Sequence, residues 1–156
     1  MRLPGLHFIV PGSLDQRTGG YIYDARIVEG LRRRNWKVHV HNLEGEFPAG
    51  DKRARESLAR SLTGFPDGAV VVIDGLAMGA LPDLVLAHRG RLCVLALVHL
   101  LLADETQLKT DVRDRFRTLE LQALNASAGV LAASTFTAAR VEGLGIDAAL
   151  VRAVPP

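Results

Sequence analysis

The sequence predicts an α/β protein with a doubly wound, mostly parallel sheet of the Rossmann-like type and helices on both of its faces. Short apolar runs alternate along the chain with segments of helical period. The runs 69–73 and 92–98 are almost wholly apolar, which indicates strands buried on both faces, as in parallel sheets covered by helices. A glycine-rich loop, 11–20, follows the first run and leads into a helix, as in a βαβ unit.

Six apolar runs are expected to form the strands of this sheet. Each is short, rich in β-branched or other apolar residues, and separated from the next by a segment long enough for a crossover helix. The predicted strands are 6–10, 37–43, 69–74, 92–98, 129–133 and 149–154.

The first three predicted helices fill the gaps between the early strands. A helix over 20–34 is indicated by Ile27 and Leu31 at a spacing of four, and Asn35 then suits a left-handed C-terminal residue. A second helix, 51–62, carries apolar residues at every fourth position. A third, 79–88, is expected to begin irregularly, because Pro82 fits only the first helical turn.

The last two predicted helices have clearer signals. The segment 109–127 carries a single apolar stripe with spacings of four and three, formed by Val112, Phe116, Leu119, Ala123 and Ala126. A helix over 135–142 begins after Ser134, whose hydroxyl is suited to cap it, and ends at two glycines.

Length and composition indicate one soluble globular domain. The chain has 156 residues, 48% of them hydrophobic and 23% charged, with a formal net charge of +2. The longest apolar stretch, 92–102, is interrupted by His99 and is too short to span a bilayer. No secretory signal is evident at the start, so a cytoplasmic location is expected.

Two arginine groups bear on the choice of partner. Residues 32–34 are consecutive arginines, and arginines recur at 113, 115 and 117. Such groups could attract phosphates or an anionic membrane surface, but the first group ends a predicted helix, where cations complement the dipole, and the second does not form a stripe. No nucleic-acid motif is present and aromatic residues are few, so we expect no nucleic-acid partner, and membrane contact is unsupported.

Two other features are interpreted as structural. Cys93 is the only cysteine and lies in an apolar run, so we expect a core residue and not a nucleophile. His7, His39 and His41 alternate along predicted strands without the spacing of a metal-ligand set, so no metal site is expected from them.

The candidate site lies where the predicted strands end. In a parallel sheet the carboxyl ends share one edge, which receives the loop 11–20, Asp74, His99 and Ser134. Within the loop, Gly12, Thr18, Gly19 and Gly20 precede a helix N-terminus, where free backbone N–H groups favour an anion such as a phosphate. The alternatives are that the glycines only shape the turn, that Asp74 bonds the next turn, that His99 ends a strand without a ligand, and that Ser134 only caps a helix.

These residues carry a resemblance to a known family over essentially the whole chain. The chain resembles the N-terminal half of a GT-B glycosyltransferase, and most closely the retaining family 4, also called glycosyl transferases group 1. The segments that carry the resemblance are Pro11-Gly12, Thr18-Gly19-Gly20, residues 30–38, Asp74-Gly75-Leu76, Val98-His99, Ser134 with Thr137, and Val154-Pro155-Pro156.

The resemblance implies an enzyme of two Rossmann-like domains that face a cleft. Residues 1–156 would be the single acceptor-side domain, and the donor domain with its paired glutamates has no counterpart here. The substrates would be a nucleotide-diphosphate sugar, with no metal or other cofactor, and an acceptor that the sequence does not identify. Gly19 and Gly20 would approach the diphosphate, and His99 would lie near the transferred sugar. Without its own C-terminal domain, this domain is expected to be inactive.

Two other classes of protein remain as alternatives. One is a stand-alone nucleotide-binding or protein-interaction module of Rossmann type, in which Glu44 would take the place of a ribose-binding acid. It is disfavoured because the chain lacks the G-x-G-x-x-G and G-x-x-x-x-G-K-[ST] signatures. The other, a response-regulator-like domain, lacks the acidic cluster after the first strand and the late lysine.

Overall fold

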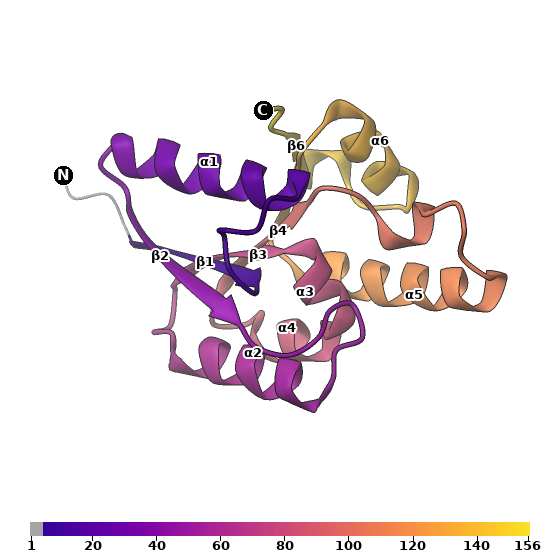
Figure 1. The fold of residues 1–156 in the computed structure, drawn as a ribbon, viewed down its shortest axis with the longest axis horizontal. Helices are drawn as coiled ribbons and strands as arrows, with labels where there is room; N and C mark the ends of the chain where they lie inside the picture. Colours follow the sequence, from indigo (N-terminus) through magenta and orange to yellow (C-terminus); the bar gives the residue numbers. More distant parts are fainter. Residues whose placement is uncertain (1–4) are drawn as a thin grey trace.

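A six-stranded sheet organises the protein in the computed structural model, which describes residues 5–156 (Figure 1). The strand order is β2-β1-β3-β4-β5-β6 and every neighbouring pair is parallel. The strands are β1 (Gly5–Pro11), β2 (Lys37–Leu43), β3 (Val70–Asp74), β4 (Cys93–Val98), β5 (Gly129–Ala132) and β6 (Val151–Ala153). The predicted Rossmann-like fold class is therefore confirmed.

Six α-helices connect the strands. They are α1 (Gly19–Arg33), α2 (Lys52–Gly64), α3 (Gly75–Ala80), α4 (Pro82–His88), α5 (Thr110–Ala126) and α6 (Thr135–Gly143), with short 3-10 turns at Leu102–Asp104 and Ala148–Leu150. None of these helices is both long enough and apolar enough to cross a bilayer, a finding that covers residues 5–156.

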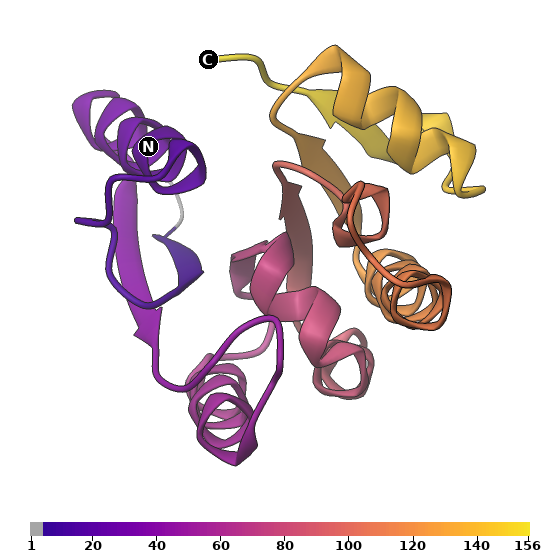
Figure 2. The same ribbon diagram turned by 45° about the vertical axis from the view of Figure 1, so that its right-hand side comes forward.

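The two faces of the sheet are covered unequally. Because right-handed crossovers run in opposite directions from β1, α1 packs on one face and the later helices pack on the other (Figure 2). On the α1 face, Leu6, Phe8 and Val10 of β1 pack with buried residues of the helix. On the opposite face, Ile9 belongs to a larger core with residues of α2, α3, α4, α5 and α6.

No helix of residues 5–156 covers the part of the α1 face around Cys93, which corrects the expectation for this residue. Cys93 is exposed, and Leu95 and Leu131 on the same face are only partly buried. A groove of about 520 Å³ runs here between α1 and the sheet, lined by apolar side chains that include Leu97 and Trp36. An apolar strand sequence cannot reveal that a covering helix is absent, so the prediction of a core cysteine was wrong.

The predicted helix over 79–88 corresponds to α4 and the last two residues of α3, which is a separate short helix. Asp74 caps α3 through its carboxylate, and α3 ends at Ala80. Pro82 then starts α4, where a residue without an N–H costs nothing. Two other local predictions are confirmed: Asn35 adopts a φ of 64° after α1, and the Ser134 hydroxyl accepts a hydrogen bond from the Thr137 amide at the start of α6.

Candidate functional site

The carboxyl ends of the three central strands meet beside the start of α1. β1, β3 and β4 are neighbours in the sheet, so Pro11, Asp74 and Val98 end side by side. A cavity of about 190 Å³ opens at this place, and its lining includes Thr18, Gly20, Asp74 and His99. The strand order reverses between β1 and β3, which is where doubly wound sheets bind their ligands.

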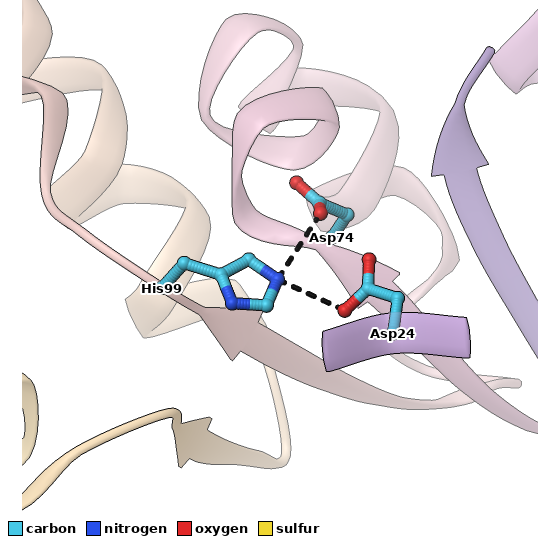
Figure 3. Close-up of side chains that lie close together, drawn as sticks. All are labelled: Asp24, Asp74 and His99. Atoms are coloured by element: carbon cyan, nitrogen blue, oxygen red, sulfur yellow. Dashed lines mark hydrogen bonds and ion pairs between the residues drawn. The ribbon is translucent and has the colours of Figure 1, made fainter. Parts of the chain in front are cut away.

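One ring nitrogen of His99 faces two buried carboxylates (Figure 3). Its Nε2 is 2.9 Å from Oδ1 of Asp24, which projects from α1, and 3.5 Å from Oδ2 of Asp74. Asp24 is fully buried, and its Oδ2 has no hydrogen-bond partner within residues 5–156. The other ring nitrogen of His99 points away from both carboxylates (Figure 3).

The surroundings shift the pKa values of His99 and Asp24 in the same direction. Burial alone would lower the pKa of His99, but hydrogen bonds and charge from Asp24 and Asp74 outweigh it and raise that pKa to about 9. Burial raises the pKa of Asp24 to about 6, although His99 opposes the rise. At neutral pH His99 is therefore a cation held by carboxylates, which makes its ring a hydrogen-bond donor and a poor general base.

Neighbouring groups fix the position of this cluster. Oδ1 of Asp74 accepts a hydrogen bond from the Leu76 amide at 2.8 Å, so this carboxylate both caps α3 and faces His99. The ring of Tyr23 packs edge-on against His99 at 5.1 Å between centroids. The Thr137 hydroxyl donates to the backbone oxygen of His99, which ties the loop after β4 to the start of α6.

The first turn of α1 faces the same cavity without a side-chain cap. Thr18 occupies the N-cap but makes no side-chain cap hydrogen bond, and no acidic residue lies in the first turn. A Cβ added at Gly20 would lie 3.4 Å from Cδ2 of His99, whereas one added at Gly19 would meet nothing within 4 Å. A glycine at position 20 thus lets the helix approach the imidazole, and the first-turn amides remain available to an anion.

Glu120 of α5 supports the wall of the cavity formed by residues 100–104. This glutamate is buried, and its two carboxylate oxygens accept hydrogen bonds from the amides of Leu102 at 2.6 Å and Ala103 at 3.1 Å. Burial raises the pKa of Glu120, while the two amides oppose that rise. The loop after β4 is thereby fixed against α5.

A Glu120→Gln substitution is expected to loosen this wall. A glutamine side chain keeps one acceptor oxygen, so one amide loses its partner, at a cost of about 1 to 2 kcal/mol in the free energy of unfolding. Hydrogen exchange should show faster exchange at Leu102 and Ala103, and urea unfolding should give the energy. Glu142→Gln, at an exposed position of α6, is the control. Equal effects of the two substitutions would contradict the role given to Glu120.

The structure brings only some of the predicted site residues to the cavity. Thr18, Gly20, Asp74 and His99 line it, whereas Gly12, Gly19 and Ser134 are not among its lining residues. Gly12 has a φ of 82° and its amide bonds the Leu43 oxygen, so it joins the ends of β1 and β2. Ser134 caps α6 and donates to the Thr137 hydroxyl that holds the His99 backbone.

Sequence reasoning missed Asp24 and Glu120. Each lies inside a helix, where an acidic residue is usually solvated. A signal existed in the helical spacing, because Asp24 falls between Gly20 and Val28 on the inward stripe of α1. Glu120 likewise falls four residues after Phe116 and three before Ala123, on the edge of the apolar stripe of α5.

The same cluster offers ligand atoms to a metal ion. One atom from each of Asp24, Asp74 and His99 lies within 4.8 Å of the others. Two carboxylates and an imidazole would suit a divalent cation, which would take the place of the proton on Nε2 of His99. With that proton in place, the arrangement is a buried ion-pair cluster.

Comparison with known proteins adds no assignment for this site. No protein-family model matches the chain, and no curated protein matches it. What the chain does must therefore be argued from its own residues.

Proposed function

We propose that this chain is the acceptor-side domain of a retaining glycosyltransferase of GT-B fold, which transfers a sugar from a nucleotide-diphosphate donor. Two features that line the same small cavity support the proposal best. They are the first turn of α1, which has no side-chain cap, and a protonated His99. Departure of a nucleoside diphosphate requires hydrogen-bond donors and positive charge near its oxygens, and both features supply them.

The size of the cavity also agrees with a donor site that is shared between two domains. Its volume of about 190 Å³ is below the roughly 300 to 1,000 Å³ of ordinary small-molecule sites. It fits one end of a ligand, such as a sugar or a phosphate group. A second domain across the cleft would enclose the remainder of the donor and exclude water from the reacting bond.

His99 then acts as a donor in the proposed reaction. Asp24 and Asp74 hold the proton on Nε2, and the opposite side of the ring can donate to a sugar hydroxyl or a phosphate oxygen. A carboxylate pair that keeps the imidazole charged does not favour proton abstraction from the acceptor. Retention of configuration through a front-face mechanism requires no such base on this side of the cleft.

A Gly19→Val substitution is expected to lower transfer by about a hundredfold without unfolding the domain, because an isopropyl group would stand between the first-turn amides and the donor diphosphate. A Cβ at Gly19 would meet nothing within 4 Å among residues 5–156, so we expect the folded domain to accept the valine. The measurement is transfer from UDP-, GDP- and ADP-sugars by the protein that carries this domain, with the anomeric configuration of the product read by NMR.

The matched control is Gly64→Ala, at the end of α2, where a Cβ also meets nothing within 4 Å. Full activity of Gly19→Val would refute the role of the loop, and an inverted product would refute retention. The isolated chain should show no transfer. Micromolar binding of NAD by the isolated chain would instead favour a nucleotide-binding module.

A further inference from the structure

Three histidines lie together at the outer edge of the sheet, remote from the cluster around His99. His7 of β1 and His39 of β2 are register partners, and His41 follows two residues further along β2. Since side chains alternate along a strand, all three project from the same face. That face is the one covered by α2, because the neighbours of His7 in β1, Leu6 and Phe8, belong to the core under α1.

The three rings and Phe65 form one contact group. Nδ1 of His7 lies 2.9 Å from Nε2 of His41. Phe65, just after α2, stacks on His7 with 4.1 Å between ring centroids and meets His41 edge-on at 4.9 Å. His39 is exposed and stacks on His7 at 5.4 Å.

Among residues 5–156, burial and the other histidines are the causes of the pKa shifts of His7 and His41. Burial and then the charge of His39 lower the pKa of His7, and burial and then His7 and His39 lower the pKa of His41. The hydrogen bond between Nδ1 of His7 and Nε2 of His41 requires one nitrogen to donate and the other to accept, so at least one of these two atoms carries a lone pair.

We propose that His7, His39 and His41 form a binding site for a divalent transition-metal ion of the Zn²⁺ type. An all-imidazole set suits zinc, nickel, cobalt or copper, whereas magnesium and calcium require oxygen ligands. Two histidines at alternate positions of one strand and a third on the next strand give three ligands on one side of an ion. Water completes a tetrahedral shell.

The ligand atoms of His7, His39 and His41 do not converge in the structure, since within residues 5–156 only those of Asp24, Asp74 and His99 lie within 4.8 Å of one another, so the site must close on the ion. With metal–nitrogen bonds of about 2.0 to 2.1 Å, ligand nitrogens in a tetrahedral site lie about 3.3 Å apart, so the pair at 2.9 Å must open by a few tenths of an ångström. His7 and His41 share one proton in their hydrogen bond. When the ion binds, this proton moves to the other nitrogen of the ring that carries it, so metal binding by these two residues releases no net proton. His39 turns out of its stack, which an exposed side chain does freely. Phe65 can stay in place, because a metal binds in the plane of the imidazole and Phe65 packs on the face of His7.

The test is titration of the tag-free chain with ZnCl₂ by calorimetry, and with CoCl₂ by visible absorption, which detects tetrahedral cobalt. One saturable ion per chain is expected, with affinity that falls below about pH 6 as protons compete for the rings. His7→Ala, His39→Ala and His41→Gln should each weaken binding at least about tenfold. His88→Ala, a histidine outside the cluster that contacts Arg91, should leave binding unchanged.

Exposed His39 provides the strictest variant, since its loss removes a ligand without disturbing the core. Zinc binding that is unaffected by His39→Ala and His41→Gln would overturn the proposal. So would binding that is lost in His99→Gln and kept in the three variants, because the ion would then lie among Asp24, Asp74 and His99. An absence of saturable binding would overturn it as well.

Discussion

A His99→Ala variant is expected to lose about 3 kcal/mol of unfolding free energy at pH 7, because it removes the cation beside a fully buried carboxylate. His99 is the group that opposes the burial-raised pKa of Asp24, so without it Asp24 holds an uncompensated buried charge or takes up a proton, and either state favours unfolding. The penalty should shrink at pH 5, since Asp24 without His99 takes up a proton more readily than in the native protein. Urea unfolding at the two pH values measures both effects, and an equal loss at each would contradict the role of Asp24.

The control for this prediction is Asp24→Asn, which removes the charge and keeps the shape. The native pKa of His99 is raised, so its protonation stabilises the fold fully below the ordinary histidine pKa, and this stabilisation is lost as pH rises through about 9. The native chain should therefore lose about 1 to 3 kcal/mol between pH 6.5 and 9.5 through this group. Asp24→Asn should flatten that slope. The double variant with His99→Ala should be more stable at pH 7 than His99→Ala alone.

A Gly45→Ala substitution is expected to destabilise the protein by about 3 kcal/mol, although Gly45 is not part of the cavity. Gly45 has a φ of 92°, which side chains rarely adopt. A Cβ there would lie 2.6 Å from Oδ1 of Asp51 and would collide with the backbone of Ala54. That oxygen accepts hydrogen bonds from the amides of Glu46 and Ala54, so the clash would also disturb the cap of α2.

Thermal and urea unfolding measure this effect, and Gly64→Ala at the other end of α2 is the comparison. No atom lies within 4 Å of a Cβ at Gly64, and alanine favours a helix by up to about 1 kcal/mol over glycine. Gly64→Ala should therefore be neutral or stabilising. If Gly45→Ala is as stable as Gly64→Ala, the close packing of the β2–α2 loop on α2 is refuted.

The regular elements could be predicted because their hydrophobic periods differ. Strand β2 was predicted with the observed bounds, and the stripe of α5 marked that helix to within one residue at each end. The short helix α3 was missed, since six residues with glycine at the first and fifth positions carry no helical period. Its start depends on the side chain of Asp74, which forms the cap only in the folded protein.

The candidate site could be predicted only where strands end. Asp74 and His99 follow apolar runs, and the parallel sheet brings their ends to one edge. Asp24 could not be found by that rule, because it reaches the site from the second turn of a helix. The exposure of Cys93 could not be predicted for a different reason. It depends on which helices cover each face of the sheet, and the composition of a strand does not specify that.

β1 is the first of the described strands along the chain, yet it lies inside the sheet, between the edge strand β2 and β3. It bonds both of these strands, which are connected by residues 44–69, a segment that includes α2. While the chain emerges from the ribosome, β1 has only β2 as a partner. Asp24 then has neither Asp74 nor His99 beside it until β3 and β4 have been made. The ion-pair cluster thus forms late, and a nascent or truncated chain lacking residues from 99 onward would carry an acidic side chain on the inward stripe of α1 with no imidazole to neutralise it.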